Sequence, residues 1–144
     1  MPTVEDAISL AVRAHAGQKD RYGQPYILHV IRVVARLFDP PAQMAAALHD
    51  VVEDTAVTLD ELRLMGYSEA VLAAVECVTR RNNETYEQFI ERIAPNPLAV
   101  RVKLADLEDN MDLRRGGLLR ADDLERVARY QRAWKRLTTG IREG

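Results

Sequence analysis

Apolar residues recur at intervals of three and four along nearly the whole chain, which is the spacing of one face of an α-helix. The first two apolar stripes consist of Val4, Ala7, Ile8, Ala11 and Val12, and of Ile27, Ile31, Val34, Ala35 and Phe38. Glycine and proline residues separate such stripes, beginning with Gly17 and Pro40. No segment alternates with the period of a β-strand. The pattern therefore predicts an all-α protein.

Local start and stop signals place the individual helices. One helix is expected to begin at Pro41 and to run without interruption to about Asp54. Others are expected to start at Thr58 and Ser68, to cover residues 85–93 and 98–111, and to close with a last element ending near Leu137. We expect a compact bundle of about seven helices in which residues 1–144 form a single domain.

Composition and charge narrow the class of protein. The only cysteine, Cys77, excludes an internal disulfide and favours a reducing compartment. No signal-peptide pattern and no membrane-length apolar run is present, so we expect a cytoplasmic protein with no membrane contact. The net charge of −2 is unlike that of a nucleic-acid binder. Because residues 1–72 carry 6 Lys and Arg against 10 Asp and Glu, the acidic half should need basic groups from the rest.

An acidic cluster interrupts an apolar run at Ala47–Thr55. On one continuous helix, His49, Asp50, Glu53 and Asp54 would share a wall opposite the apolar side. A solvated face is the ordinary interpretation. However, Asp50 and Asp54 would repel each other at i and i+4, and acids at the carboxyl end of a helix oppose its dipole. The pattern therefore favours a bound divalent cation.

Further metal ligands must come from elsewhere in the chain. Of the two other histidines, His29 opens a helix after a loop, whereas His15 continues an apolar stripe and is interpreted as structural. Asp106 follows an apolar pair in the segment KLADLEDN. Together with His49 and Asp50, these residues give two imidazoles and two carboxylates. That set suits manganese or ferrous iron, with zinc as an alternative.

The motifs GQPYILH, HDVVEDT and VKLAD occur in an order and spacing that resembles the HD-superfamily hydrolase domain of the RelA/SpoT family. The resemblance extends from about Ala14 to Tyr130 and is closest in size to the small alarmone hydrolases. It implies one metal ion, usually Mn²⁺, bound by His29, His49, Asp50 and Asp106. It also implies removal of the 3′-pyrophosphate from guanosine tetra- or pentaphosphate to give GDP or GTP.

The resemblance further implies that Glu53 and Asp54 act on the nucleophilic water and do not bind the metal. The residues agree with that assignment, because Glu53 lies one helical turn from His49 and could accept a proton from the water. Asp54 would act as a second acid–base group or position Glu53. The sequence leaves open which of the two carries the proton.

Candidate substrate contacts lie in the second half of the chain. Asn110 matches the family asparagine that contacts the nucleotide, and Arg126 and Tyr130 match a family Arg-x-x-x-Tyr element in the last helix. An exposed arginine and a packed tyrosine are the structural alternative for that pair. Lys103 is placed to contact a phosphate or to pair with nearby acids.

One loop departs from the family pattern. Where alarmone hydrolases carry Arg-Lys against the guanine base, this chain has Asp20-Arg21. An aspartate cannot stack on a base as a guanidinium can. Arg21 or Tyr22 could supply the contact instead, or the cavity could prefer another base.

These observations rank three hypotheses. The first is a metal-dependent phosphohydrolase acting on a small phosphorylated nucleotide such as guanosine tetraphosphate. The second keeps the chemistry and changes the substrate to NADPH or another phosphorylated nucleotide. The third is a non-catalytic nucleotide-binding module. Since small helical domains often pair, a homodimer is an additional expectation.

Overall fold

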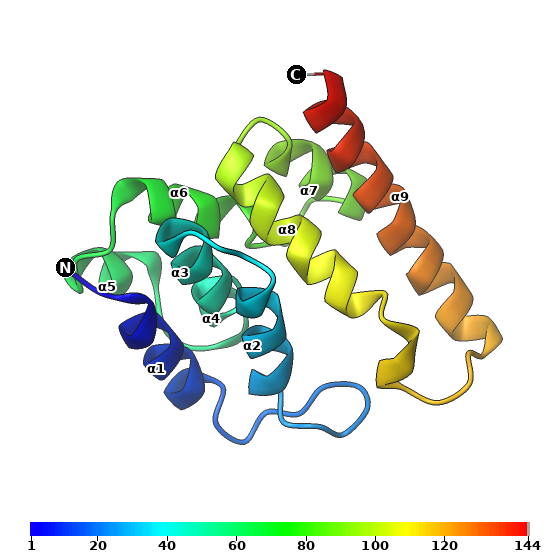
Figure 1. Ribbon diagram of the computed structural model, residues 1–144, viewed down its shortest axis with the longest axis horizontal. Coiled ribbons are helices and arrows are strands. Elements are labelled where there is room, and N and C mark those ends of the chain that lie inside the picture. The colour runs from blue at the N-terminus through cyan, green and yellow to red at the C-terminus, as the bar shows by residue number, and fades with distance from the viewer. Residues whose placement is uncertain (144) are drawn as a thin grey trace.

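The structure is a computed structural model that describes residues 1–143, with side chains through residue 139. This part of the chain contains nine α-helices and one 3₁₀ helix and no strand, which confirms the all-α prediction (Figure 1). The elements are α1 Val4–Ala14, α2 Ile27–Ala35, α3 Pro40–Leu48, α4 Val51–Asp54, α5 Leu59–Leu64, α6 Glu69–Cys77, α7 Tyr86–Ile93, α8 Pro97–Asn110, η1 Leu113–Arg115 and α9 Ala121–Glu143.

Side-chain caps start most of these helices. A side-chain oxygen accepts a hydrogen bond from a backbone N–H of the first turn at Thr3, Asp39, Thr58, Ser68, Thr85 and Asn96. Each such bond satisfies a donor that the helix itself leaves unpaired. Proline in the first turn of α3 and α8 has no N–H to satisfy there. Short polar residues at helix starts therefore explain why the helices begin where they do.

Helix α3 lies at the centre of the core. It packs against α1, α2, α6 and α8. Its buried residues Ala42, Ala45, Ala46 and Ala47 are fully inaccessible, as is Leu48. Because alanine has a small side chain, neighbouring helices can approach α3 closely. The long α9 runs along the outside and packs on α8 and α7 (Figure 1). This packing brings the turn after α3 next to α8.

The predicted continuous helix from Pro41 to Asp54 is wrong. Helix α3 ends at Leu48, and a separate turn of helix, α4, begins at Val51. His49 and Asp50 lie between them, and the φ of −108° and ψ of −2° at Asp50 depart from helical geometry. Glu53 and Asp54 therefore lie at the end of the single turn α4 and not at the end of a long helix that begins at Pro41. The break also raises the number of described helices above the predicted seven.

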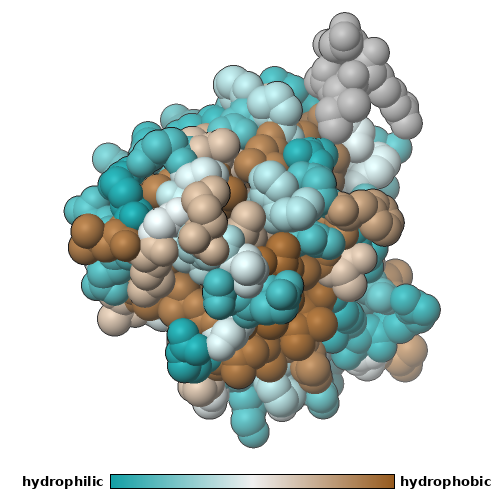
Figure 2. Space-filling model, turned by 60° about the vertical axis from the view of Figure 1, so that its left-hand side comes forward, coloured by the Kyte–Doolittle hydropathy of each residue, from teal (hydrophilic) through white to brown (hydrophobic). Residues whose placement is uncertain are grey.

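Several predicted members of the apolar stripes are not buried. Val12, Ile31 and Phe38 are exposed by 46%, 44% and 92%, whereas Ala7, Ala11 and Val34 are buried as expected. Helix α2 ends at Ala35, so Phe38 lies beyond it. Figure 2 shows apolar surface gathered among polar groups on the side of the molecule where α1 and α5 lie. Among the described residues, no helix is long and apolar enough to cross a membrane.

Candidate metal centre and active site

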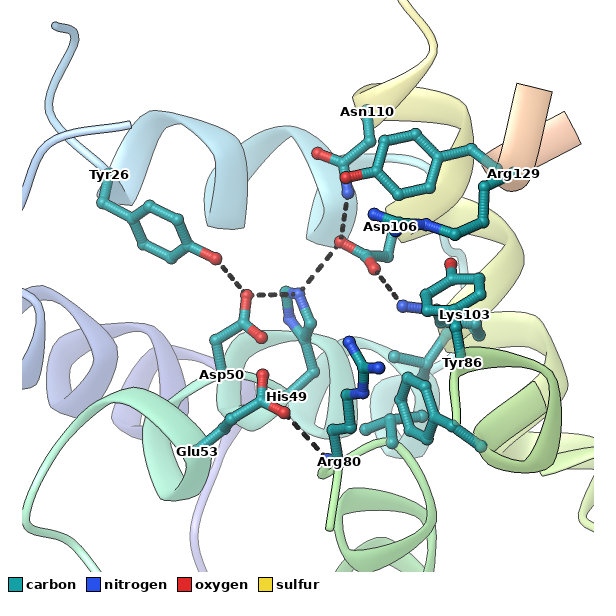
Figure 3. A pocket seen from close by; sticks show the side chains of 14 residues that line it. Tyr26, His49, Asp50, Glu53, Arg80, Tyr86, Lys103, Asp106, Asn110 and Arg129 are labelled. Atoms are coloured by element: carbon teal, nitrogen blue, oxygen red, sulfur yellow. Dashed lines mark hydrogen bonds and ion pairs between the residues drawn. The ribbon is translucent and has the colours of Figure 1, made fainter. Parts of the chain in front are cut away.

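Residues distant in the sequence line one cavity of about 200 Å³ (Figure 3). The predicted site residues His49, Asp50, Glu53, Lys103, Asp106, Asn110 and Tyr130 contribute to its walls. Acidic side chains reach it from the segment around α4 and, in the case of Asp106, from α8. Basic side chains reach it from α8, α9 and the loop after α6. The fold thus brings an acidic and a basic wall together around a single hollow.

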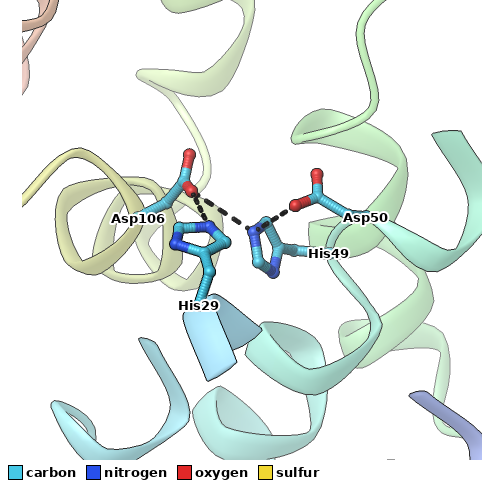
Figure 4. Close-up of side chains that lie close together, drawn as sticks. All are labelled: His29, His49, Asp50 and Asp106. Carbon is cyan, nitrogen blue, oxygen red and sulfur yellow. Dashed lines mark hydrogen bonds and ion pairs between the residues drawn. The ribbon is translucent and has the colours of Figure 1, made fainter. Parts of the chain in front are cut away.

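Four buried side chains converge beside this cavity. His29 comes from α2, His49 and Asp50 from the turn after α3, and Asp106 from α8 (Figure 4). One donor atom from each lies within 4.8 Å of the others. Asp106 Oδ1 is 2.9 Å from His29 Nε2 and 3.3 Å from His49 Nε2, and Asp50 Oδ2 is 2.9 Å from His49 Nε2. His15 is also buried but is not part of this group.

The histidine rings present the correct nitrogen for a metal. His49 Nδ1 lies 2.5 Å from the carbonyl oxygen of Ala46. Because a carbonyl only accepts, Nδ1 carries the proton, and Nε2 of a neutral ring offers its lone pair to the group. His49 Nε2 is buried and makes no well-aligned hydrogen bond to a described residue, although carboxylate oxygens of Asp50 and Asp106 lie 2.9 and 3.3 Å from it. A ring nitrogen that faces two carboxylates and a second imidazole fits a divalent metal ion.

The charges of the group also fit a cation. Burial would lower the pKa of His49, but the neighbouring Asp50 and Asp106 carboxylates raise it well above its usual value. Burial would raise the pKa of Asp106, but the Lys103 ammonium and both histidines hold it well below its usual value. The carboxylates therefore attract positive charge into a buried place. A divalent ion would supply that charge in place of protons on the rings.

A second layer of residues, which the sequence interpretation missed, holds His29. Asp109 is fully buried and its Oδ2 lies 2.6 Å from His29 Nδ1. Arg32 Nε donates to Asp109 Oδ1 at 2.7 Å, and Arg115 Nη1 lies 3.1 Å from Oδ2. Burial would raise the pKa of Asp109, but these partners lower it to about 2. A carboxylate behind a ligating histidine fixes its ring and tautomer. The i+3 spacing from Asp106 on one helix face could have revealed it.

The two carboxylate ligand candidates are themselves held by neighbours. The Tyr26 hydroxyl, in the PYILH motif, donates to Asp50 Oδ2. Lys103 Nζ donates to Asp106 Oδ2 at 2.9 Å, and Asn110 Nδ2 to Asp106 Oδ1 at 3.3 Å. Asn110 was predicted to contact substrate, and Lys103 either to contact a phosphate or to pair with nearby acids, as it does here with Asp106. Both line the cavity and also position Asp106.

Glu53 and Asp54 lie beside the four candidate metal ligands His29, His49, Asp50 and Asp106, which we call the metal group. Oxygens of Asp50, Glu53 and Asp54 lie within 4.8 Å of one another. Burial, followed by the charges of Asp50 and Asp54, raises the pKa of Glu53. Burial, followed by the charge of Asp50, raises the pKa of Asp54. Glu53 Oε1 also accepts from the backbone N–H of Arg80 at 2.8 Å. A carboxylate with a raised pKa is better able to hold a proton near neutral pH. Of these two acids, Glu53 lines the cavity and Asp54 does not.

A second cavity of about 280 Å³ adjoins the first and shares Tyr26, Asn110 and Tyr130 with it. The remaining predicted substrate residues Arg21, Tyr22 and Arg126 line this second cavity. The structure therefore places the predicted residues in two neighbouring spaces, one at the metal group and one beyond it. Together they could accommodate the two ends of an elongated ligand.

The departure at Asp20 has a structural explanation. Its carboxylate accepts from the backbone N–H groups of Tyr22 and Gln24 at 2.9 and 3.0 Å, and from Arg115 Nη2 at 3.1 Å. Arg115 also lies over the Tyr22 ring, 5.4 Å from its centre. A Cβ at Gly116 would lie 2.5 Å from Tyr22 Cε1, so this glycine leaves room for the ring. Asp20 thus shapes the loop that carries Tyr22.

Arg80, Tyr86 and Arg129 also line the first cavity and were not among the predicted site residues. Arg80 lies in the loop after α6, Tyr86 begins α7, and Arg129 lies on α9 (Figure 3). Arg80 follows a Val-Thr pair after which the related hydrolases carry basic residues, but the alignment there is too loose to select it. No motif marks Tyr86 or Arg129, and neither stands next to a predicted metal ligand in the sequence. Only the folded arrangement reveals that they face the metal group.

Comparison with known proteins identifies the family of the chain. The family described as "HD domain" matches residues 7–112. The chain is 34% identical over 139 residues to a GTP pyrophosphokinase of Streptomyces coelicolor, covering 88% of this chain and 16% of that protein. It is 32% identical over 141 residues to the bifunctional (p)ppGpp synthase/hydrolase SpoT of Escherichia coli, covering 88% of this chain and 20% of that protein. It is 32% identical over 120 residues to a guanosine-3′,5′-bis(diphosphate) 3′-pyrophosphohydrolase of Aquifex aeolicus, covering 75% and 17%.

A solved structure is also similar to this chain, and here the match covers most of both chains. It is described as a metazoan ortholog of SpoT that hydrolyses ppGpp and plays a role in starvation responses. The TM-score is 0.75 at 29% identity, covering 96% of this chain and 85% of the other. By contrast, the chain spans a fifth or less of the length of the curated relatives named above. The resemblance to the RelA/SpoT hydrolase domain is confirmed, and the chain belongs to the HD domain family.

Proposed function

We propose that residues 1–144 act as one HD-type domain that removes the 3′-pyrophosphate of guanosine tetra- or pentaphosphate, giving GDP or GTP and pyrophosphate. The observation that carries this proposal is the juxtaposition of a metal-binding group with basic side chains across one cavity. The relatives named for (p)ppGpp hydrolysis support the substrate. The name GTP pyrophosphokinase belongs to a protein of which this chain covers 16%.

We infer that His29, His49, Asp50 and Asp106 hold one divalent ion, Mn²⁺ in the first place and Fe²⁺ or Zn²⁺ as alternatives. When bound, the ion would supply a water of lowered pKa and neutralise charge on the phosphoryl oxygens. Tyr26, Lys103 and Asp109 keep the ligands in position through the hydrogen bonds described above.

Glu53 is assigned the role of accepting the proton of the attacking water. Its carboxylate lines the cavity beside Asp50, and its raised pKa suits proton acceptance. The water oxygen joins the phosphorus, the bond from that phosphorus to the ribose 3′ oxygen breaks, and that oxygen takes up a proton. Asp54, which faces the same acids from outside the cavity lining, positions Glu53 or returns the proton.

The basic and polar residues are assigned to the substrate. Lys103 and Asn110 would contact its phosphates near Asp106, and Tyr130 lines both cavities and would contact the sugar. The second cavity would receive the nucleoside between Arg21, Tyr22 and Arg126.

A second candidate function keeps the metal chemistry and changes the substrate to NADPH or another phosphorylated nucleotide. The observation that favours it is Asp20. Its ion pair with Arg115 holds a carboxylate at the position where the resemblance implies a basic residue against the nucleobase. A non-catalytic module is disfavoured because all four ligand candidates and both acids are present. A cytoplasmic location, the absence of a nucleic-acid partner and a homodimer stay predictions.

The test is an assay of the purified protein with Mn²⁺ against guanosine tetraphosphate, guanosine pentaphosphate, NADPH and nucleoside monophosphates. We expect pyrophosphate release from the two guanosine compounds. Chromatography of the products should show GDP and GTP. Asp106→Asn is the matched control and should release nothing. Phosphate release from NADPH alone would replace the first candidate by the second. If neither pyrophosphate nor phosphate is released from any compound, the non-catalytic nucleotide-binding module is the hypothesis that remains.

A further inference from the structure

Two arginines on the basic wall of the first cavity surround one aromatic ring. The guanidinium carbon of Arg129 lies 4.8 Å from the centre of the Tyr86 ring, and that of Arg80 lies 5.6 Å from it. Lys103 Nζ lies 5.9 Å from the same centre. Figure 3 shows Arg80 and Arg129 reaching the cavity from different elements. Three cations therefore gather within 6 Å of one ring.

These cations differ in how they are neutralised. Lys103 forms an ion pair with Asp106 at 2.9 Å. Within the described part of the chain, by contrast, neither the Arg80 nor the Arg129 guanidinium makes an ion pair. Glu53 accepts a hydrogen bond from the backbone N–H of Arg80 and not from the Arg80 guanidinium. The two guanidinium groups thus provide positive charge that the protein leaves available at the cavity.

Two donors at this ring are also buried without a partner. The Nε of Arg129 and the hydroxyl of Tyr86 have no hydrogen-bond partner among the described residues. A buried donor without an acceptor destabilises a folded protein, so such groups usually serve a ligand or another specific role. Both residues line the same cavity as Asp50, Glu53 and Asp106. The unsatisfied donors therefore point to an acceptor-rich anion that occupies this cavity.

We propose that Arg80, Arg129 and the Tyr86 hydroxyl form a subsite for the second phosphate of a diphosphate group whose first phosphate lies at the metal group. The inference rests on the proposed function and narrows it. A group of one phosphate would reach only the metal group and Lys103, whereas a diphosphate would also reach the two arginines. Guanidinium groups bind phosphate oxygens through paired, charge-assisted hydrogen bonds. The subsite therefore selects diphosphates over monophosphates.

The experiment compares the binding of inorganic pyrophosphate and inorganic phosphate to the Mn²⁺-loaded protein by titration calorimetry, with a titration of each anion into Mn²⁺ alone as the blank. The wild-type chain should prefer pyrophosphate by at least roughly tenfold. Arg129→Gln and Arg80→Gln should each reduce this preference several-fold, and the double variant should nearly abolish it. Tyr86→Phe keeps the ring and should lose part of the preference.

Arg132→Gln is the matched control, because Arg132 lies on the same helix but outside this cavity and pairs with Glu125 at 3.2 Å. It should leave the preference unchanged. Melting temperatures verify that each variant is folded. If Arg129→Gln fails to fold, Arg80→Gln and Tyr86→Phe carry the test, since Arg80→Gln retains the backbone bond to Glu53. Equal wild-type affinity for the two anions, or an unchanged preference in the variants, would overturn the subsite.

The outcome is separable from that of the proposed function. A wild-type protein that binds pyrophosphate through these arginines but hydrolyses no nucleotide would support the subsite and contradict the enzyme. A protein that hydrolyses guanosine tetraphosphate at an unchanged KM after Arg80→Gln and Arg129→Gln would support the enzyme and contradict the subsite.

Discussion

Single residues outside the ligand set determine how the metal-binding group is arranged. The Ala46 carbonyl fixes the His49 tautomer, and Asp109 does the same for His29. Both contacts direct Nε2 toward Asp106. The ligand candidates could be predicted from residue type and motif spacing. Their supporting partners could not, because a buried aspartate and an exposed one look alike in a sequence.

Changing Asp109 to Asn tests this support. An asparagine oxygen can still accept from His29 Nδ1 but no longer carries the charge that polarises the ring and attracts Arg32 and Arg115. We expect Mn²⁺ affinity to fall by roughly 10–100-fold, measured by competition with a chelator of known affinity. Glu108→Gln, one residue away and hydrogen-bonded to Trp134, is the control and should retain its metal. Equal affinity in both variants would remove the role of Asp109.

Changing Glu53 to Gln tests the assigned proton acceptor. Glutamine can still accept from the Arg80 backbone N–H, so the loop should keep its place. We expect the protein to bind about one metal ion as before, while turnover of guanosine tetraphosphate falls by roughly 10²–10⁴-fold. Metal content by elemental analysis and single-substrate kinetics check the two parts. Undiminished turnover would show that another group takes the proton.

At the scale of elements, helical periodicity predicted which segments are helices but not where they end. The apolar spacing continues through residues 49–54, so no local pattern marks the break at His49 and Asp50. The break has a consequence for the site. Adjacent residues on a regular helix point in directions about 100° apart, whereas the turn lets the His49 ring contact both Asp50 and Asp106. The predicted acids Glu53 and Asp54 instead form the last two residues of the separate turn α4.

The loop that carries Arg80 depends on a clamp formed from α7. Arg92 Nη2 donates to Glu84 Oε1 at 2.7 Å and to the Thr79 carbonyl at 2.8 Å, and its Nη1 contacts the carbonyls of Glu76 and Cys77. Glu84 also accepts from the backbone N–H of Arg81 at 2.8 Å. The backbone on both sides of Arg80 is thus held by one ion pair between largely buried side chains.

Changing Glu84 to Gln should destabilise the protein in a pH-dependent way. The hydrogen bonds from Arg92 lower the pKa of Glu84 from 4.5 to about 2. Because the folded pKa is the lower one, its stabilisation is complete above pH 4.5 and is lost as the pH falls toward 2. We expect a loss of about 1–3 kcal/mol at pH 7 by urea unfolding, and a smaller difference from wild type near pH 3. Glu87→Gln on the exposed side of α7 is the control. A difference that does not shrink in acid would exclude the ion pair as its cause.

At the scale of the whole molecule, the metal group joins segments that are far apart in sequence. Its members lie on α2, on the turn after α3 and on α8. That convergence could be inferred only from the motif resemblance, since periodicity says nothing about which helices meet. The arrangement of two neighbouring cavities could not be predicted from the sequence, because it depends on how α9 lies against α7 and α8.

Metal should therefore stabilise the entire fold. At a free Mn²⁺ concentration a hundredfold above its dissociation constant, the gain is about 2.7 kcal/mol, because the ion binds only the folded chain. We expect thermal unfolding to shift upward by several degrees with Mn²⁺ and to return on addition of a chelator. Asp106→Asn should show no such shift while keeping its own cooperative transition. An equal shift in that variant would place the ion elsewhere on the molecule.

The ion pair between Asp20 and Arg115 joins positions separated by 95 residues, and it lies beside the second cavity, away from Glu53 and Asp50. Substitutions at Asp20 would reshape the compartment for the nucleoside while sparing the residues around the bond that is cleaved, whereas Arg115 has to stay because it also pairs with Asp109 behind His29. Related chains could in this way acquire new substrate preferences in few mutational steps, each starting from a working hydrolytic centre.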